Sequence, residues 1–202
     1  AQAEAAAIAD KAQAEVAVRA DALPVEERYM NVEGTGMQTK NMKDYTWRTG
    51  AGPALEEMLN DADLVDLGYI VRLIEAGGVV PRWQDLPKGA RITRANSWRL
   101  KVTLGCGRML PVLVLSYPWL DREHPDRQGA QLRRLLPLFK LALEEVQKTG
   151  GPHATFGLMM DYACLPQKPF ATDEEQARFK RGLGSINCWY AHPKTYVLLM
   201  TT

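Results

Sequence analysis

The sequence predicts an α/β domain with a parallel sheet and flanking helices, preceded by a helical arm. Three apolar runs of strand length occur at residues 112–116, 155–161 and 195–200, and helical patterns separate them. Continuous apolar runs are typical of strands that are buried on both faces. A β-α-β-α-β order with crossovers of this length favours parallel strands and right-handed connections. We therefore expect the three runs to be adjacent or near-adjacent parallel strands.

The helical patterns between these runs have recognisable ends. The first pattern has an apolar stripe over 132–146 and ends at the pair Gly150-Gly151. Pro137 lies inside this pattern, so we expect it either to kink the helix or to divide it. The second pattern begins with the capping box Thr172-Asp-Glu-Glu175 and continues with a stripe over 179–190. Both patterns are long enough to cross a sheet.

Upstream of the sheet, the sequence divides into an arm and the start of the domain. Residues 1–30 are rich in alanine and predict a helix, and residues 31–53 contain four glycines and form a predicted linker or arm. The domain itself is expected over 54–202, with a helix over 64–74 that stops at Gly77-Gly78. Small residues on one helix face and two aromatics in the arm predict a partner interface. These residues are Ala5, Ile8, Ala12, Val16, Tyr45 and Trp47.

The composition excludes several classes of protein. Lys and Arg number 25 against 24 Asp and Glu, a net charge of +1 that lacks the basic excess typical of nucleic-acid binders. No apolar run approaches the roughly 18–20 residues needed to span a bilayer, and peripheral membrane association stays open. The three cysteines are far apart and odd in number, which favours an intracellular, reducing compartment, either the cytoplasm or the interior of an organelle.

Polar side chains follow the first two predicted strands. Ser116 and Asp121 follow the first strand, and Asp161 and Gln167 follow the second. Ligands of open parallel sheets bind beyond the carboxyl ends of the strands, so these side chains predict a binding crevice. Each residue also has a structural interpretation, because Ser and Asp at strand ends commonly bond to nearby backbone N–H groups.

Other candidate chemistry in the chain is weak. Glu123, His124 and Asp126 are close in sequence, but no second histidine has metal-binding spacing, and we predict no metal site. Cys164 lacks an evident base and is interpreted as a buried structural cysteine. The sequence contains no dinucleotide fingerprint after a strand and no P-loop, so the residues alone predict no cofactor. Three basic residues are interpreted as a solvated helix face: Arg178, Lys180 and Arg181.

Two segments resemble known families. Val114-Leu-Ser-Tyr117, followed by Trp119 and Asp121, resembles the first box of Toll/interleukin receptor (TIR) domains, in which a buried strand ends before a nucleotide-facing loop. Residues 160–167, followed by Trp189-Tyr-Ala191, resemble the Trp-Ile-Asp-x-x-Cys-Ile-Asn-Gln stretch of heterokaryon-incompatibility (HET) domains. The stretch from about 79 to 202 resembles TIR/HET-like proteins of protists such as dinoflagellate algae.

The resemblance implies a flavodoxin-like sheet, a nucleotide such as NAD as a ligand of the crevice, and self-association as a way of acting. TIR domains that cleave NAD use a glutamate in a helix after the fourth strand, which the resemblance places beyond Thr202, and no acidic residue follows Glu175 in this chain. We therefore predict a protein-interaction or scaffold module that is not catalytically complete in this chain.

Two alternatives stay open at this point. One is a NAD-cleaving or nucleotide-processing enzyme whose catalytic glutamate lies outside the chain. The other is a peripheral structural subunit of a larger, cytoplasmic or organellar complex, tethered by its N-terminal arm. In the leading and the last interpretation, the predicted partners are other protein chains that contact residues 1–53.

Overall fold

The computed structural model describes residues 53–97, 100, 110–152 and 154–201. The predicted arm, with Ala5, Ile8, Ala12, Val16, Tyr45 and Trp47, lies outside the described residues, so its interface stays a prediction. The described helices, 3-10 helices (η) and strands are, in chain order, α5 (Pro53–Glu57), η1 (Met58–Asn60), β1 (Leu64–Asp66), α6 (Leu67–Glu75), η2 (Trp83–Asp85), η3 (Lys88–Ala90), β2 (Arg91–Ile92), η4 (Arg94–Asn96), β3 (Val112–Ser116), α8 (Ala130–Gly150), β4 (Gly157–Met159), α9 (Asp161–Cys164), α10 (Asp173–Ala191) and β5 (Tyr196–Leu199).

A five-stranded sheet forms the centre of the domain, in the order β2-β1-β4-β3-β5. β3 pairs in parallel with both β4 and β5, which confirms that the three apolar runs are adjacent or near-adjacent parallel strands. β1 pairs antiparallel with β4 and with β2, so the sheet is mixed at that side. The fold is therefore α/β, with its parallel part where the sequence predicted it.

The helix predicted over 64–74 was wrong at its start. Leu64–Asp66 is a strand, and the helix α6 begins at Leu67. The Asp66 side chain accepts a hydrogen bond from the Tyr69 N–H at 3.1 Å and caps the helix at this point. β1 lies between two strands that are distant in sequence, and such pairing overrides the local apolar spacing.

The predicted helix stops and starts are confirmed at two positions. Gly77 has a φ of +77°, and the N–H groups of Gly77 and Gly78 donate to the carbonyls of Ile74 and Leu73, the Schellman arrangement. At the start of α10 the Thr172 hydroxyl accepts from the Glu175 N–H at 3.1 Å, as the capping box predicts. α8 contains Pro137 and is assigned as one helix, so the chain is not divided there.

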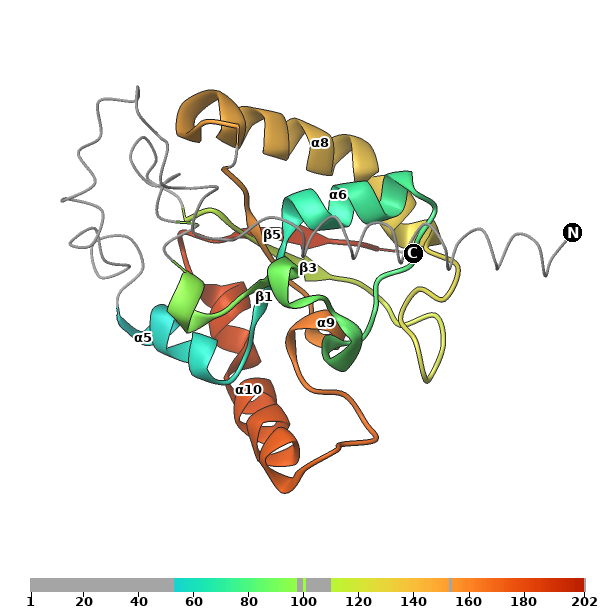
Figure 1. Ribbon diagram of the computed structural model, residues 1–202, viewed down its shortest axis with the longest axis vertical. Helices are drawn as coiled ribbons and strands as arrows, with labels where there is room; N and C mark the ends of the chain where they lie inside the picture. Colours follow the sequence, from blue (N-terminus) through green and yellow to red (C-terminus); the bar gives the residue numbers. More distant parts are fainter. Residues whose placement is uncertain (1–52, 98–99, 101–109, 153, 202) are drawn as a thin grey trace, which may run out of the picture.

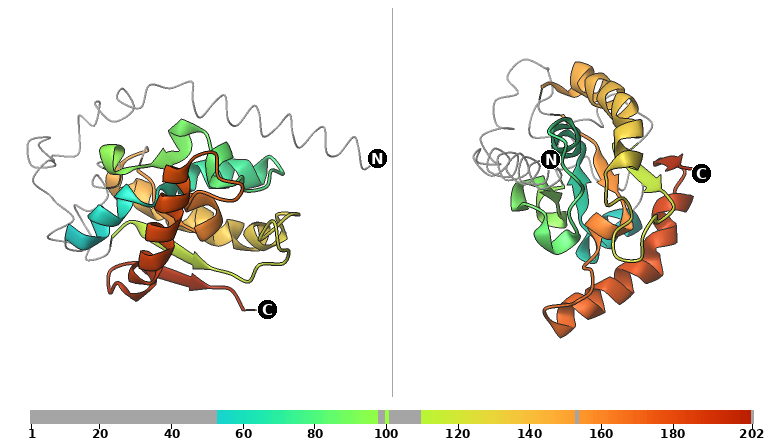
Figure 2. Two further views of the ribbon diagram at one scale, coloured as in Figure 1. Left: turned by 90° about the horizontal axis from the view of Figure 1, so that it is seen from below. Right: turned by 90° about the vertical axis from the view of Figure 1, so that its right-hand side faces the viewer.

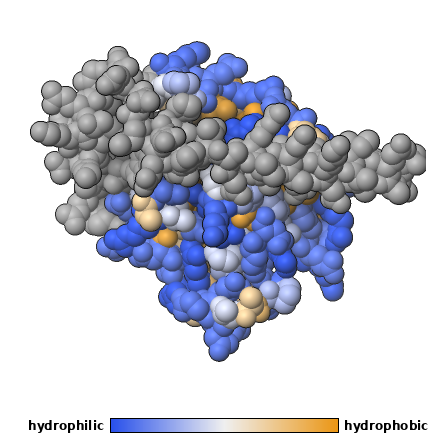
Figure 3. All heavy atoms as spheres, in the orientation of Figure 1, coloured by the Kyte–Doolittle hydropathy of each residue, from blue (hydrophilic) through white to orange (hydrophobic). Residues whose placement is uncertain are grey.

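The helices form two layers on the sheet (Figures 1 and 2). α6 and α8 lie side by side on one face, and α10 crosses the opposite face. Trp189 of α10, Tyr69 of α6 and Phe139 of α8 are fully buried against the sheet. The described surface seen in Figure 3 is mostly hydrophilic, with small apolar patches. Among the described helices, none has the length and apolar character that a membrane crossing needs.

Candidate functional site

Asp161 is the centre of the predicted crevice at the carboxyl ends of β3 and β4. It is the first residue of α9, directly after β4, while Trp119 lies in the loop that follows β3. Because β3 and β4 are parallel neighbours, these two segments begin at the same edge of the sheet (Figure 1). The Trp119 indole N–H donates to Asp161 Oδ2 at 3.2 Å, and the Tyr162 N–H donates to Oδ1 at 2.7 Å.

The carboxyl group of Asp161 lies in an unfavourable position for a charge. Burial raises its pKa above the ordinary value for aspartate, and the hydrogen bonds from Tyr162 and Trp119 oppose this shift only in part. The buried Tyr117 hydroxyl ends beside this carboxyl and, like the two donors above, favours its charged form, although it makes no well-aligned hydrogen bond within the part of the chain that the structure describes. Burial raises the pKa of Tyr117 well above its usual value, and the nearby Asp161 carboxylate adds to the shift. A carboxyl and a buried phenol therefore meet at the carboxyl ends of β3 and β4.

Gln167 also lies near the carboxyl ends of these strands, but its side chain is engaged in hydrogen bonds to backbone carbonyls. Its Nε2 donates to the Asp161 carbonyl at 3.1 Å and to the Leu165 carbonyl at 2.9 Å. Its own backbone N–H donates to Gln84 Oε1 at 3.1 Å, and Gln84 Nε2 donates back to the Gln167 carbonyl. Gln167 thus holds the loop after α9 and is a positioning residue for Asp161. The sequence analysis had assigned no role to Gln84.

Three aromatic rings pack together next to Asp161. Tyr162 makes edge contacts with Trp119, at 5.7 Å between ring centroids, and with His124, at 4.7 Å. His124 Nδ1 accepts from the Asp126 N–H at 2.9 Å, and Nε2 faces the Val80 carbonyl at 3.0 Å. These two partners assign the ring proton to Nε2. Sequence reasoning had placed Trp119 in a family motif without assigning it a role.

The other two predicted site residues do not join Asp161. The Asp121 carboxylate accepts from the Glu123 N–H at 2.8 Å and pairs with Arg127 at 3.2 Å, and these bonds lower its pKa. The Asp121 side chain therefore stabilises its own surface loop. Ser116 is the last residue of β3, and its carbonyl accepts from the Met200 N–H at 2.8 Å. Among the described contacts, none links either residue to Asp161.

Cys164 is a structural residue, as its sequence context predicted. The side chain is fully buried, its Sγ donates to the Leu158 carbonyl at 3.3 Å, and it accepts from the Met160 N–H. Burial raises the pKa of this thiol far above that of an ordinary cysteine. In the described ranges, no cluster of three or more His, Cys, Asp or Glu residues could hold a metal ion.

A second polar cluster ties α10 to the segment between α6 and β2. Asp63 is almost fully buried and accepts from Arg178 at 2.7 Å and from the Trp83 indole N–H at 2.7 Å. The guanidinium groups of Arg178 and Arg91 both lie over the Trp83 ring, 5.0 and 4.5 Å from its centroid. Arg178 was therefore wrongly assigned to a solvated face, whereas Lys180 and Arg181 are exposed.

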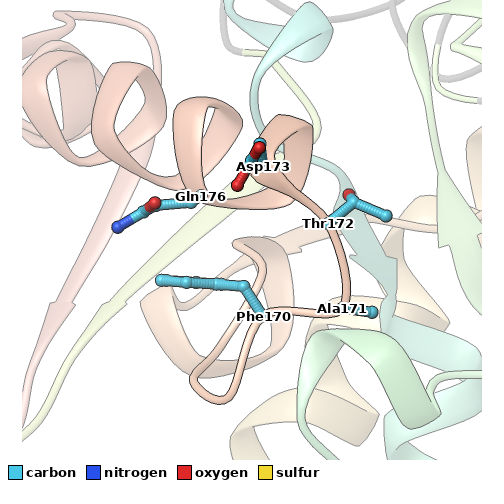
Figure 4. A pocket seen from close by; sticks show the side chains of 5 residues that line it. All are labelled: Phe170, Ala171, Thr172, Asp173 and Gln176. Atoms are coloured by element: carbon cyan, nitrogen blue, oxygen red, sulfur yellow. The ribbon is translucent and has the colours of Figure 1, made fainter.

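A hollow of about 430 Å³ lies at the start of α10 (Figure 4). Its lining residues are Phe170, Ala171, Thr172, Asp173 and Gln176. Two backbone donors at this helix start are engaged, because Thr172 accepts from the Glu175 N–H and Glu175 accepts from the Ala171 N–H. Asp161 is not among the residues that line this hollow.

β5 is an edge strand with β3 on its inner side (Figure 2). The Met200 N–H donates to Ser116, and the Lys194 carbonyl accepts from Leu110, both at 2.8 Å. In a parallel ladder each residue turns both backbone groups to one side, and successive residues alternate. Even-numbered residues therefore turn to β3, and the N–H and C=O groups of Val197 and Leu199 turn outward.

The side chains of this edge are apolar and exposed. Leu199 is 71% exposed and Tyr196 is 42% exposed. The chain carries no charged residue after Lys194.

No protein-family model, no curated protein and no solved structure matches this chain.

Proposed function

We propose that this domain is a protein-interaction module and that β5 is its contact edge. The observation that carries the proposal is the outer side of β5, with outward backbone groups at Val197 and Leu199 and large exposed apolar side chains. An exposed edge of this kind is a template for a strand from another chain. Such pairing would also bury the apolar side chains, which favours association.

The opposite edge of the sheet gives the contrast. β2 has two residues, lies between the turns η3 and η4, and begins with Arg91. Short length and a charged residue are two means by which natural proteins protect sheet edges. β5 has neither a charge nor a proline within its bounds. The resemblance of residues 79–202 to TIR/HET-like proteins supports the same class of function, because those domains commonly act by association.

A site-specific photocrosslinker tests the contact edge. We would place a photoreactive amino acid at position 199 of the full chain, in the organism that expresses it, and at position 141 as a control. Leu141 is 59% exposed and lies on α8, away from β5. The proposal expects discrete adducts at 199 that disappear when Val197→Pro is added. Adducts that are equal at both positions, or absent at 199, would contradict it.

The Asp161 crevice favours a second candidate function, the binding of a nucleotide without its cleavage. The specific observation is the buried Tyr117 hydroxyl, which ends beside the Asp161 carboxyl without a well-aligned hydrogen bond in the described structure. A ribose diol can donate to a carboxylate and accept from a phenol, and Trp119, which is 41% exposed, can stack on a base. The resemblance suggests NAD as the ligand.

Titration calorimetry with NAD tests this second candidate. It expects binding that Asp161→Asn and Tyr117→Phe each weaken at least tenfold, and that Asp121→Asn leaves unchanged. Asp121 is the matched control because its carboxylate is engaged by Arg127 in its own loop. Equal losses for Asp121→Asn and Asp161→Asn, or no binding by the unchanged chain, would exclude the crevice as a NAD site.

A further inference from the structure

We propose that β5 pairs antiparallel with β5 of a second copy of this chain, forming a two-fold symmetric dimer with one continuous sheet. The inference rests on the proposed function of β5 as a contact edge and names its partner. A two-fold axis requires a surface that is complementary to itself, and the edge of a single strand meets this requirement when its outward backbone groups can face their own copies.

The backbone fixes which registers are open. Outward groups belong to odd-numbered residues, so two copies can pair only when an odd-numbered residue faces another odd-numbered residue. Thr195 is less available, because its N–H donates to the His192 carbonyl at 3.3 Å. Within the bounds of β5, Val197 opposite Leu199 of the partner subunit uses all the outward groups of both strands. The two-fold axis then passes beside Leu198.

The side chains of this register match on both faces of the sheet. Val197 and Leu199 lie on one face and meet their counterparts there, while Tyr196, Leu198 and Met200 lie on the other. Cross-strand pairs of aromatic, β-branched and aliphatic residues stabilise sheets. The 71% exposed Leu199 side chain gains a neighbour without any rearrangement of β3.

The charges do not oppose this pairing. Lys194 is the nearest charged residue, four positions from Leu198. Antiparallel pairing sends the two copies of Lys194 to opposite ends, about eight strand residues or roughly 27 Å apart. At that separation salt screens their repulsion at physiological ionic strength. A strand of another protein, or another segment of this polypeptide, could use the same edge. Neither of these alternatives predicts dimers of the purified chain that depend on Val197 and Leu199.

Sedimentation of the purified 202-residue chain over a concentration series is the first test. The proposal expects a monomer–dimer equilibrium that Val197→Pro and Leu199→Lys each weaken at least tenfold. Val197→Pro removes an outward N–H group, a change that edge strands tolerate. Leu141→Lys is the matched control on α8 and leaves the equilibrium unchanged. Circular dichroism verifies that each variant is folded. If Val197→Pro does not fold, Leu199→Lys still tests the pairing, because it changes a side chain and keeps every backbone group.

Cysteine crosslinking tests the register. In a Cys106→Ser, Cys188→Ser background, the variants Val197→Cys, Leu198→Cys and Leu199→Cys each place a thiol at a different distance from the axis. A pair without direct hydrogen bonds has Cα atoms near 4.5 Å apart, within the range that a disulfide requires. We expect Leu198→Cys to form disulfide-linked dimers at least tenfold faster than its neighbours. Faster crosslinking at 197 or 199 would overturn this register.

The outcomes separate this inference from the proposed function. A chain that stays monomeric at about 100 μM overturns self-pairing. If the photocrosslinker at 199 still gives adducts that depend on Val197, the interaction module stands with a different partner. If both experiments fail, the proposed function fails with the inference. A dimer that persists in both β5 variants places the dimer contact elsewhere and also overturns self-pairing.

Discussion

At the scale of single residues, the buried pair of Asp63 and Arg178 joins elements that are distant in sequence. The side chains of Asp63 and Arg178 are 4% and 20% exposed, and Trp83 supplies the second donor to the carboxylate. The removal of one partner from a buried pair leaves a charge without compensation, which is more costly than the pair is favourable. This asymmetry leads to a stability prediction.

Arg178→Met should lower the free energy of unfolding by about 2–4 kcal/mol, because the buried Asp63 side chain loses the cation that it directly contacts. Urea denaturation measures the change. Arg127→Met is the matched control, since Arg127 pairs with Asp121 and Glu123 on the surface, and exposed pairs contribute little. Equal effects of the two substitutions would show that the Asp63 cluster is not an energetic link.

Asp161 should make stability depend on pH in the direction opposite to that of an ordinary salt-bridged aspartate. Its folded-state pKa is raised, so its contribution is most favourable below the unfolded value near 3.8 and decreases as pH rises through the folded value. The stability of the wild type minus that of Asp161→Asn should therefore fall as pH rises above 3.8.

For Asp121, whose pKa is lowered, the difference in stability between wild type and Asp121→Asn should instead fall as pH drops below 3.8. Denaturation at several pH values measures both slopes, and a rising difference for Asp161 would contradict its burial.

The candidate site could be predicted only where local sequence carries the information. Asp161 and Gln167 follow a strand, so strand-end reasoning found them. Asp121 follows a strand as well, but Arg127, six residues on, engages its carboxylate. Gln84 contacts Gln167 from 83 positions away in the chain, and local spacing alone does not reveal such a contact.

At the scale of elements, two glycines of α10 have opposite environments. A Cβ atom on Gly182 would lie 2.5 Å from Leu165 Cδ2 and 3.0 Å from the Asp61 carbonyl oxygen, whereas one on Gly184 would meet nothing within 4 Å. Gly182 thus allows α10 to approach the chain before β1. The same helix therefore provides both a test position and a control.

Gly182→Ala should lower the free energy of unfolding by about 1–3 kcal/mol, because the backbone oxygen of Asp61 cannot move away as a side chain can. Gly184→Ala should raise it by roughly 0.5–1 kcal/mol through helix propensity alone. Thermal or urea denaturation of the two variants measures both signs. Stabilisation by both substitutions would contradict the close contact between α10 and Asp61.

The elements themselves were predictable in proportion to their length and periodicity. α8, α10 and the three parallel strands have strong local patterns, and the structure confirms them. β1 has three residues and is defined by its pairing with β4 and β2. The sequence alone therefore predicted these residues as part of the adjoining helix. The two-residue β2 depends in the same way on distant contacts, and local sequence does not specify it.

At the scale of the whole molecule, the sheet has two unequal edges. The β2 edge is short and begins with an arginine, whereas the β5 edge is uncharged and apolar, and its outward backbone groups pair with no other described strand. The helices cover the two faces of the sheet (Figure 2) and leave the outer side of β5 as the place where the sheet can continue. We therefore expect this edge to bind a strand from another chain.

Residue-resolved amide hydrogen exchange tests that claim most directly. In a dilute sample the Met200 amide, which bonds to Ser116, should exchange slowly, while the outward amides of Val197 and Leu199 exchange fast. On assembly the amides of Val197 and Leu199 should slow at least tenfold and Met200 should stay slow. Outward amides that exchange equally fast in the dilute and the assembled states would contradict the account.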